Sequence, residues 1–112
     1  MKEELQRAAD VGSEEWLRCR ACDLEVTTRA LRIEMNGAHA HAFVNPNGAR
    51  FEIGCFAAAP GCVDWGGVEV AFSWFPGWSW QIAVCGRCSR HLGWRYRLAE
   101  GTFHGLILAD LR

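Results

Sequence analysis

Long apolar segments are missing from this chain. No uninterrupted apolar run approaches the roughly 20 residues that a membrane-spanning helix requires. The opening stretch, MKEELQRAADVGSEEW, also lacks the apolar core of a secretory signal peptide. We therefore expect a cytoplasmic protein with no membrane partner.

Clustered positive charge is also missing. The chain has 12 Lys and Arg residues against 13 Asp and Glu residues, a formal net charge of −1, and its Arg residues are scattered. Proteins that bind nucleic acid or anionic membrane surfaces usually show a basic patch. The composition therefore argues against nucleic acid as a partner.

Repeats, low-complexity tracts and helix-period patterns are equally scarce. The 112 residues suit one small domain. We expect a polar lead-in over 1–14 and a globular domain over 15–112. Alternating patterns predict an antiparallel all-β fold, with strands at Trp16–Cys19, Ala30–Met35, His41–Val44, Arg50–Phe56, Val68–Trp74, Trp80–Cys85, Trp94–Leu98 and Phe103–Leu108.

Aromatic residues are concentrated in the segment Phe72–Trp80, which reads FSWFPGWSW. The Pro76-Gly77 pair predicts a tight turn. A hairpin around it would place Trp74 opposite Trp80, with Val68, Val70 and Phe72 continuing the same face. Downstream, Trp94 and Tyr96 alternate with Arg95 and Arg97, so that a strand carries aromatic rings on one face and cations on the other. These indoles could form either a core or a binding box.

Two Cys-x-x-Cys motifs stand far apart in the sequence. Cys19 and Cys22 form the first, and Cys85 and Cys88 form the second. Four thiolates favour a closed tetrahedral zinc site, so we predict one structural Zn²⁺ that joins two distant hairpins. Two disulfides or a thioredoxin-type redox pair are less favoured alternatives, because the chain shows neither a signal peptide nor a βαβ context.

The remaining cysteines and histidines are assigned no chemistry. Cys55 and Cys62 are expected to be free thiols in the core. His39 and His41 alternate on a predicted strand, and paired imidazoles can bind metal, but ordinary surface or hydrogen-bonding roles are favoured for them and for His91 and His104.

Five motifs in order resemble one known family. They are Cys19-x-x-Cys22, Phe43-Val44-Asn45-Pro46-x-Gly48, Phe72-Ser73-Trp74-Phe75-Pro76-Gly77-x-x-Trp80, Cys85-x-x-Cys88-x-x-His91-Leu92-Gly93-Trp94, and Phe103-x-Gly105-Leu106. Together they resemble the thalidomide-binding (CULT) domain of cereblon, and they look most like the stand-alone bacterial homologues. The resemblance covers roughly 16–108.

The resemblance implies a β-tent fold, in which two antiparallel sheets meet at an angle and are pinned by zinc. It also implies a pocket walled by Trp74, Trp80 and Trp94 that takes a flat cyclic imide, such as the glutarimide ring of thalidomide analogues. Main-chain groups of Phe72 and Trp74, which flank Ser73, would hydrogen-bond the imide. The loop at Asn45 and Pro46 would close one side, and Tyr96 would lie beside the cage. The implied natural ligands are cyclic imides at damaged protein C-termini, with uridine-like rings also accommodated.

Two other functions are compatible with parts of the sequence. A three-Trp box could read methylated ammonium groups through cation–π attraction, but the nearest carboxylate, Glu69, is predicted to lie on the face opposite Trp74. A methionine sulfoxide reductase of the B type has a similar fold and two zinc-binding cysteine pairs, yet 102–111 lacks the cysteine nucleophile it needs. The sequence therefore favours a non-catalytic binding domain.

Overall fold

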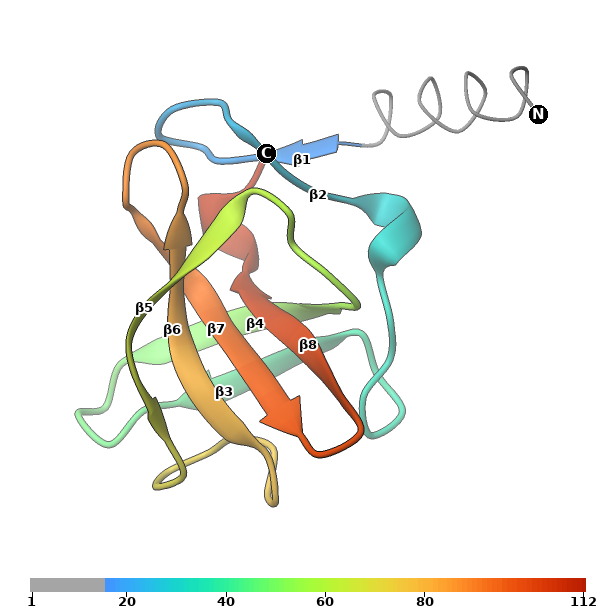
Figure 1. The fold of residues 1–112 in the computed structure, drawn as a ribbon, viewed down its shortest axis with the longest axis vertical. Helices are drawn as coiled ribbons and strands as arrows, with labels where there is room; N and C mark the ends of the chain where they lie inside the picture. The colour runs from blue at the N-terminus through green and yellow to red at the C-terminus, as the bar shows by residue number, and fades with distance from the viewer. Residues whose placement is uncertain (1–15) are drawn as a thin grey trace.

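The computed structural model describes residues 16–112 (Figure 1). The predicted lead-in over 1–14 lies outside this range. Eight strands and two short 3₁₀ helices follow one another along the chain, and the described residues contain no α-helix. The elements are β1 (Trp16–Arg18), β2 (Glu25–Thr28), η1 (Arg29–Leu31), β3 (Ala40–Val44), β4 (Arg50–Phe56), β5 (Cys62–Glu69), β6 (Ser79–Cys85), β7 (His91–Leu98), β8 (Gly101–Ile107) and η2 (Leu108–Asp110).

The strands form two antiparallel sheets. One contains β1 and β2, and the other has the order β3-β4-β8-β7-β6-β5. Figure 1 shows β3 and β4 crossing behind β6, β7 and β8 in a different direction, so the larger sheet turns sharply where β4 pairs with β8. The predicted all-β fold with two antiparallel sheets is confirmed.

The register of β6, β7 and β8 decides which residues share a face. Trp80 lies opposite Tyr96, and Ile82 lies opposite Trp94. Because residues paired across a ladder project to the same side, these four side chains stand on one face of the sheet. Arg95 and Arg97, which alternate with the two aromatic residues of β7, stand on the other.

Two clusters of buried side chains form the core. The first lies near the cysteine motifs and includes Cys19, Phe56, Cys85 and Leu106. The second includes Phe75, Tyr96 and Phe103, and Trp74, Trp80 and Trp94 pack against its edge. The side chains of these three tryptophans are therefore partly buried, between the core and the surface.

Two predicted strands are wrong. Ala30–Met35 overlaps η1, and only Arg32 of this segment makes an isolated bridge to the large sheet, through Phe56. The predicted strand Val68–Trp74 begins where β5 is ending, because β5 occupies Cys62–Glu69 instead. Val70 and Phe72 are 79% and 76% exposed, so their alternation does not mark a buried face. Strand β2, at Glu25–Thr28, was not predicted.

Gly93 allows β7 and β8 to approach closely. A Cβ at this position would overlap the carbonyl oxygen of Gly105 and lie 2.9 Å from the Cα of Leu106. We expect Gly93→Ala to lower the free energy of unfolding by about 1–3 kcal/mol, because backbone atoms must shift to admit the methyl group. Chemical denaturation measures this change. The matched control is Gly101→Ala, where a Cβ meets nothing within 4 Å; equal losses from the two variants would contradict the explanation.

Candidate functional site: an aromatic pocket beside a four-cysteine centre

A cavity of about 470 Å³ opens on the aromatic face of the large sheet. Strands β6 and β7 supply its wall, the turn between β3 and β4 supplies one rim, and the loop between β5 and β6 supplies another. Its volume falls in the range of small-molecule sites. The lining residues are Asn45, Pro46, Asn47, Phe51, Phe72, Trp74, Trp80, Ile82, His91, Trp94 and Tyr96.

Trp74 and Trp94 form one corner of the cavity. Their ring centroids are 4.8 Å apart and their planes meet at 73°. Phe43 stacks on Trp74 at 4.9 Å and 10°, and Phe51 meets Trp94 edge-to-face at 5.3 Å. Such offset and edge-to-face contacts are favourable for aromatic pairs. They hold the two indoles in fixed orientations at the cavity wall.

Hydrogen bonds from two indoles tie the loop between β5 and β6 to its surroundings. Trp80 donates through Nε1 to the carbonyl of Ala71 at 2.7 Å, and Trp74 donates through Nε1 to the carbonyl of Val44 at 3.3 Å. Phe72 has a positive φ of 59°, which turns the chain sharply before Trp74. A rigid frame therefore presents the main chain on either side of Ser73.

The Pro76-Gly77 pair forms the predicted tight turn, but this turn does not join the two strands of the predicted hairpin. The N–H of Trp78 donates to the carbonyl of Phe75 at 2.9 Å, and Gly77 has φ of 92°, as a type II turn requires. However, no ladder joins Trp74 to Trp80. Trp80 pairs with Glu69, and Trp74 lies in the loop, so the predicted facing pair is wrong. Both rings nevertheless line the same cavity, Trp80 from strand β6 and Trp74 from the loop between β5 and β6.

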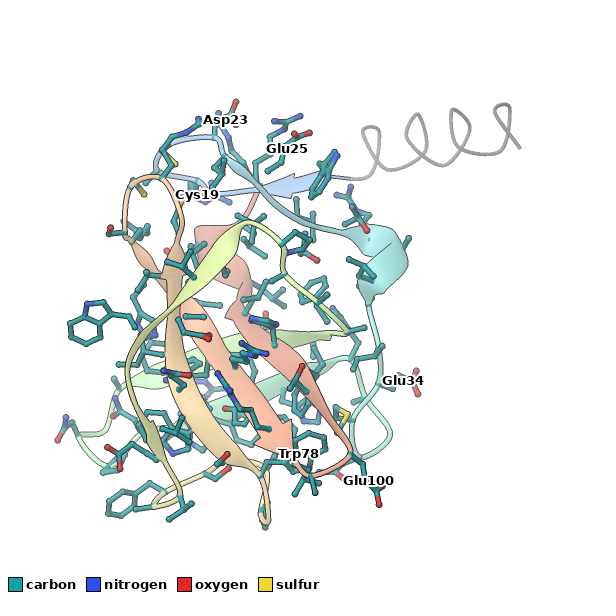
Figure 2. The ribbon with its side chains drawn as sticks, in the orientation of Figure 1. Cys19, Asp23, Glu25, Glu34, Trp78 and Glu100 are labelled. Atoms are coloured by element: carbon teal, nitrogen blue, oxygen red, sulfur yellow. The ribbon has the colours of Figure 1, made fainter. Side chains whose placement is uncertain are left out.

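Seven of the eight predicted pocket residues line the cavity, and Ser73 does not. The Ser73 hydroxyl donates to the carbonyl of Phe75 at 3.0 Å and accepts from its N–H at 3.3 Å, which shapes the loop. Trp78 also stays outside and packs on Phe103 at 4.9 Å. Figure 2 shows it at the end of the sheet farthest from Cys19.

Sequence reasoning did not select four lining residues. Phe51 lies two residues before the buried Ile53 on β4, and Ile82 lies two residues after Trp80 on β6. Residues two apart on a strand share a face, so strand periodicity could have identified both as lining residues. Asn47 belongs to a turn that Asn45 stabilises, since the Asn45 side-chain oxygen accepts from the N–H groups of Asn47 and Ala49 at 3.0 and 2.8 Å.

His91, the fourth of these residues, presents a neutral imidazole. Its Nε2 lies 2.9 Å from the carbonyl of Gly93, to which it donates, and its ring meets Trp94 edge-to-face at 4.8 Å. Burial lowers the pKa of His91 below its usual value. The described lining contains no Asp, Glu, Lys or Arg. The cavity is thus an apolar, uncharged box with polar groups at its rim.

The four motif cysteines converge at one end of the molecule. Cys19 and Cys22 come from the turn between β1 and β2, Cys85 is the last residue of β6, and Cys88 lies in the turn between β6 and β7. Figure 2 shows the sulfur atoms gathered near Cys19 at this end. All four sulfurs lie within 4.8 Å of one another, with Cys19 to Cys88 at 3.7 Å and Cys22 to Cys85 at 3.5 Å.

These distances fit a tetrahedral metal. Zn–S bonds of about 2.3 Å imply sulfur atoms about 3.8 Å apart. The N–H of Arg87 donates to the Cys85 sulfur at 3.4 Å. Burial alone would raise the pKa of Cys85, but N–H groups of Cys88 and Arg87 lower it to about 7, which favours the thiolate that a metal binds. A bound ion would neutralise the thiolates and join the two turns.

The other two cysteines lie outside this group. Cys55 is buried in the second core cluster, and burial raises its pKa to about 11. Cys62, the first residue of β5, pairs with Cys85 on β6, and burial raises the pKa of Cys62 to about 12. Neither is poised as a nucleophile at neutral pH.

The chain is similar to cereblon proteins of several vertebrates. The chain is 36% identical to the cereblon protein of Danio rerio over 101 residues, which is 83% of this chain and 23% of that protein. For Xenopus tropicalis cereblon the identity is 36% over 102 residues, 84% of this chain and 23% of the relative. For Gallus gallus cereblon the identity is 36% over 81 residues, which is 70% of this chain and 18% of that protein. No family model matches.

The chain thus spans about a quarter, or less, of the length of the curated relatives it matches. The described residues include no helix long and apolar enough to cross a membrane. With 36% identity over most of its length, this chain is a cereblon-like (CULT) domain.

Proposed function

We propose that the domain binds small cyclic imides, without catalysing a reaction, in the pocket walled by Trp74, Trp80 and Trp94. The observation that carries this proposal is an uncharged aromatic cavity bordered by unpaired main-chain groups. In the described residues, the N–H and C=O groups of Phe72 and Trp74 make no hydrogen bond to protein. A cyclic imide offers two carbonyl acceptors, one N–H donor and an apolar edge, which is what such a site can satisfy.

The same chemistry extends to glutarimide, thalidomide analogues, cyclic imides at the C-termini of damaged proteins and uridine-like rings, because all present the imide pattern in a flat ring. Structural zinc in the four-cysteine centre would hold β6 and β7 together, and these strands carry Trp80 and Trp94. We place the domain in the cytoplasm in this proposal, with an imide or a modified protein C-terminus as its partner.

A methylated ammonium ligand fits the cavity less well. Cages for such cations gain from a nearby carboxylate, and the described lining has none. Glu69 pairs with Trp80 and so stands on the aromatic face, contrary to the prediction, yet it is exposed and does not line the cavity.

Catalysis by a reductase-type thiol also fits poorly. Strand β8 contains no cysteine, and the thiols of Cys55 and Cys62 both have raised pKa values. The site offers walls and hydrogen bonds but no activated nucleophile.

Tryptophan fluorescence tests the ligand class. We expect glutarimide and thalidomide to change the emission saturably, because three indoles line the cavity, and trimethyl-lysine to leave it unchanged. N-methylglutarimide is the matched control, since it keeps the ring but lacks the N–H donor, and it should bind more weakly. Saturation by trimethyl-lysine alone would overturn the proposal.

A further inference from the structure

The face of the large sheet opposite the aromatic pocket carries a polar row that imide binding does not use. Arg95 and Arg97 alternate with Trp94 and Tyr96 along β7, so they project to this opposite face. Gln81 on β6 and His104 on β8 are the Cα partners of Arg95, so their side chains stand beside it. The row crosses three strands.

A second cavity, of about 440 Å³, opens above part of this row. Its size also suits a small molecule. The loop 57–60 and the start of β5 form one side, and Arg95, Thr102 and His104 form the other. The loop contributes three alanines and a proline, so the cavity combines an apolar wall with a polar one.

Positive charge exceeds negative charge in the network that joins the polar row to Asp64. Asp64, the one carboxylate among the described lining residues, accepts from Nη1 of Arg95 at 2.8 Å and from Nη2 of Arg97 at 3.0 Å. Nη2 of Arg97 also donates to the neutral Gln81 side chain at 2.7 Å. A single carboxylate therefore serves two guanidinium groups, and one positive charge is left without a counter-charge in this network.

Three buried nitrogen atoms of the row lack a partner within the described part of the chain. They are Nε of Arg95, Nε of Arg97 and Nδ1 of His104. Buried polar atoms in folded proteins are nearly always hydrogen-bonded, so such a group calls for a water, an ion or a ligand. For Arg95, Nη1 donates to Asp64, and Nη2 makes no hydrogen bond to the described residues, while the buried Nε also lacks a partner.

His104 adds hydrogen-bonding capacity without charge. Burial and the nearby Arg95 lower its pKa to about 4, so the imidazole is neutral at pH 7. The excess charge is thus carried by guanidinium, whose planar edge matches the two oxygens of a carboxylate or a phosphate.

We propose that this cavity binds a small molecule whose oxyanion group, a carboxylate or a phosphate, pairs with the Arg95 guanidinium through Nη2 while a short apolar part rests on the loop 57–60. This site lies on the other face of the sheet from the aromatic pocket and does not depend on imide binding.

Nuclear magnetic resonance of the arginine Nε–H groups tests the proposal directly. The probes are butyrate, inorganic phosphate and butyramide, which is a neutral analogue of butyrate, all at constant ionic strength. We expect the Arg95 Nε–H signal to shift saturably with butyrate, with phosphate or with both, and not with butyramide. A response to only one of the two anions identifies the oxyanion class.

Substitutions separate a binding role from a general charge effect. Arg95→Lys keeps the charge but loses the planar edge, and we expect it to weaken anion binding by about tenfold or more, as judged by the Arg97 Nε–H signal. Arg50→Gln, which removes an exposed cation outside the lining, should leave affinity unchanged. The proposal is overturned if neither anion gives a saturable shift, if butyramide acts equally, or if Arg95→Lys binds as the unsubstituted protein does.

Discussion

Replacing Cys85 with serine is expected to remove the bound metal and unfold the domain together. Its sulfur lies 3.5 Å from that of Cys22 and belongs to the group of four within 4.8 Å. Binding of a structural zinc contributes an apparent 10–16 kcal/mol in small zinc domains, about as much as the whole stability of a domain of this size. Elemental analysis for the metal and circular dichroism for the fold measure the two losses.

Cys62→Ala and Cys55→Ala are the matched controls for this experiment. Cys62 is the Cα partner of Cys85, yet neither it nor Cys55 belongs to the group of four. Both variants should keep one zinc per chain, although Cys55→Ala removes a buried side chain and should cost some stability. A folded Cys85→Ser protein that retains a full equivalent of zinc would count against the four-thiolate site.

The metal centre and the aromatic pocket share two strands. Strand β6 runs from the pocket residue Trp80 to Cys85, and β7 returns from His91, just after Cys88, to Trp94. Fixing the turn between these strands fixes the register that places Trp80 opposite Tyr96 and Ile82 opposite Trp94. Loss of the ion should therefore disturb the pocket, even though the thiols do not line it.

Strands with one buried face were predictable from the sequence. β6, β7 and β8 carry apolar side chains at alternate positions, and the observed strands begin or end within a few residues of the predicted ones. The cysteine pairs were also readable, because two sulfurs spaced by two residues are a short-range pattern.

The segment before the Pro76-Gly77 turn was not predictable in the same way. Val68 and Val70 alternate as a buried strand would, but both are exposed, because β5 is an edge strand whose pairing with β6 ends at Glu69. The chain then leaves the sheet, and contacts distant in sequence fix Trp74: stacking on Phe43 and a hydrogen bond to the carbonyl of Val44. Local periodicity carries no information about such partners.

Replacing Trp80 with alanine is expected to weaken imide binding by about thirtyfold or more while the zinc content stays unchanged. The side chain forms a wall of the cavity, and its Nε1 holds the loop through the carbonyl of Ala71 at 2.7 Å. Truncating an aromatic anchor in a small pocket typically costs 2 kcal/mol or more, about thirtyfold in affinity. Fluorescence titration with glutarimide, combined with elemental analysis, measures both quantities.

Two further substitutions show why Trp80 matters. Trp80→Phe keeps an aromatic wall but removes the N–H donor, so an affinity between those of the unsubstituted protein and Trp80→Ala would assign part of the effect to the loop that presents Phe72 and Trp74. Trp65→Ala removes an indole that is 62% exposed and does not line the cavity, and it should bind imide normally. Unweakened binding in Trp80→Ala, or an equal loss in Trp65→Ala, would place the imide elsewhere. Weakened binding in Trp80→Ala with zinc retained would separate the role of the pocket wall from that of the metal.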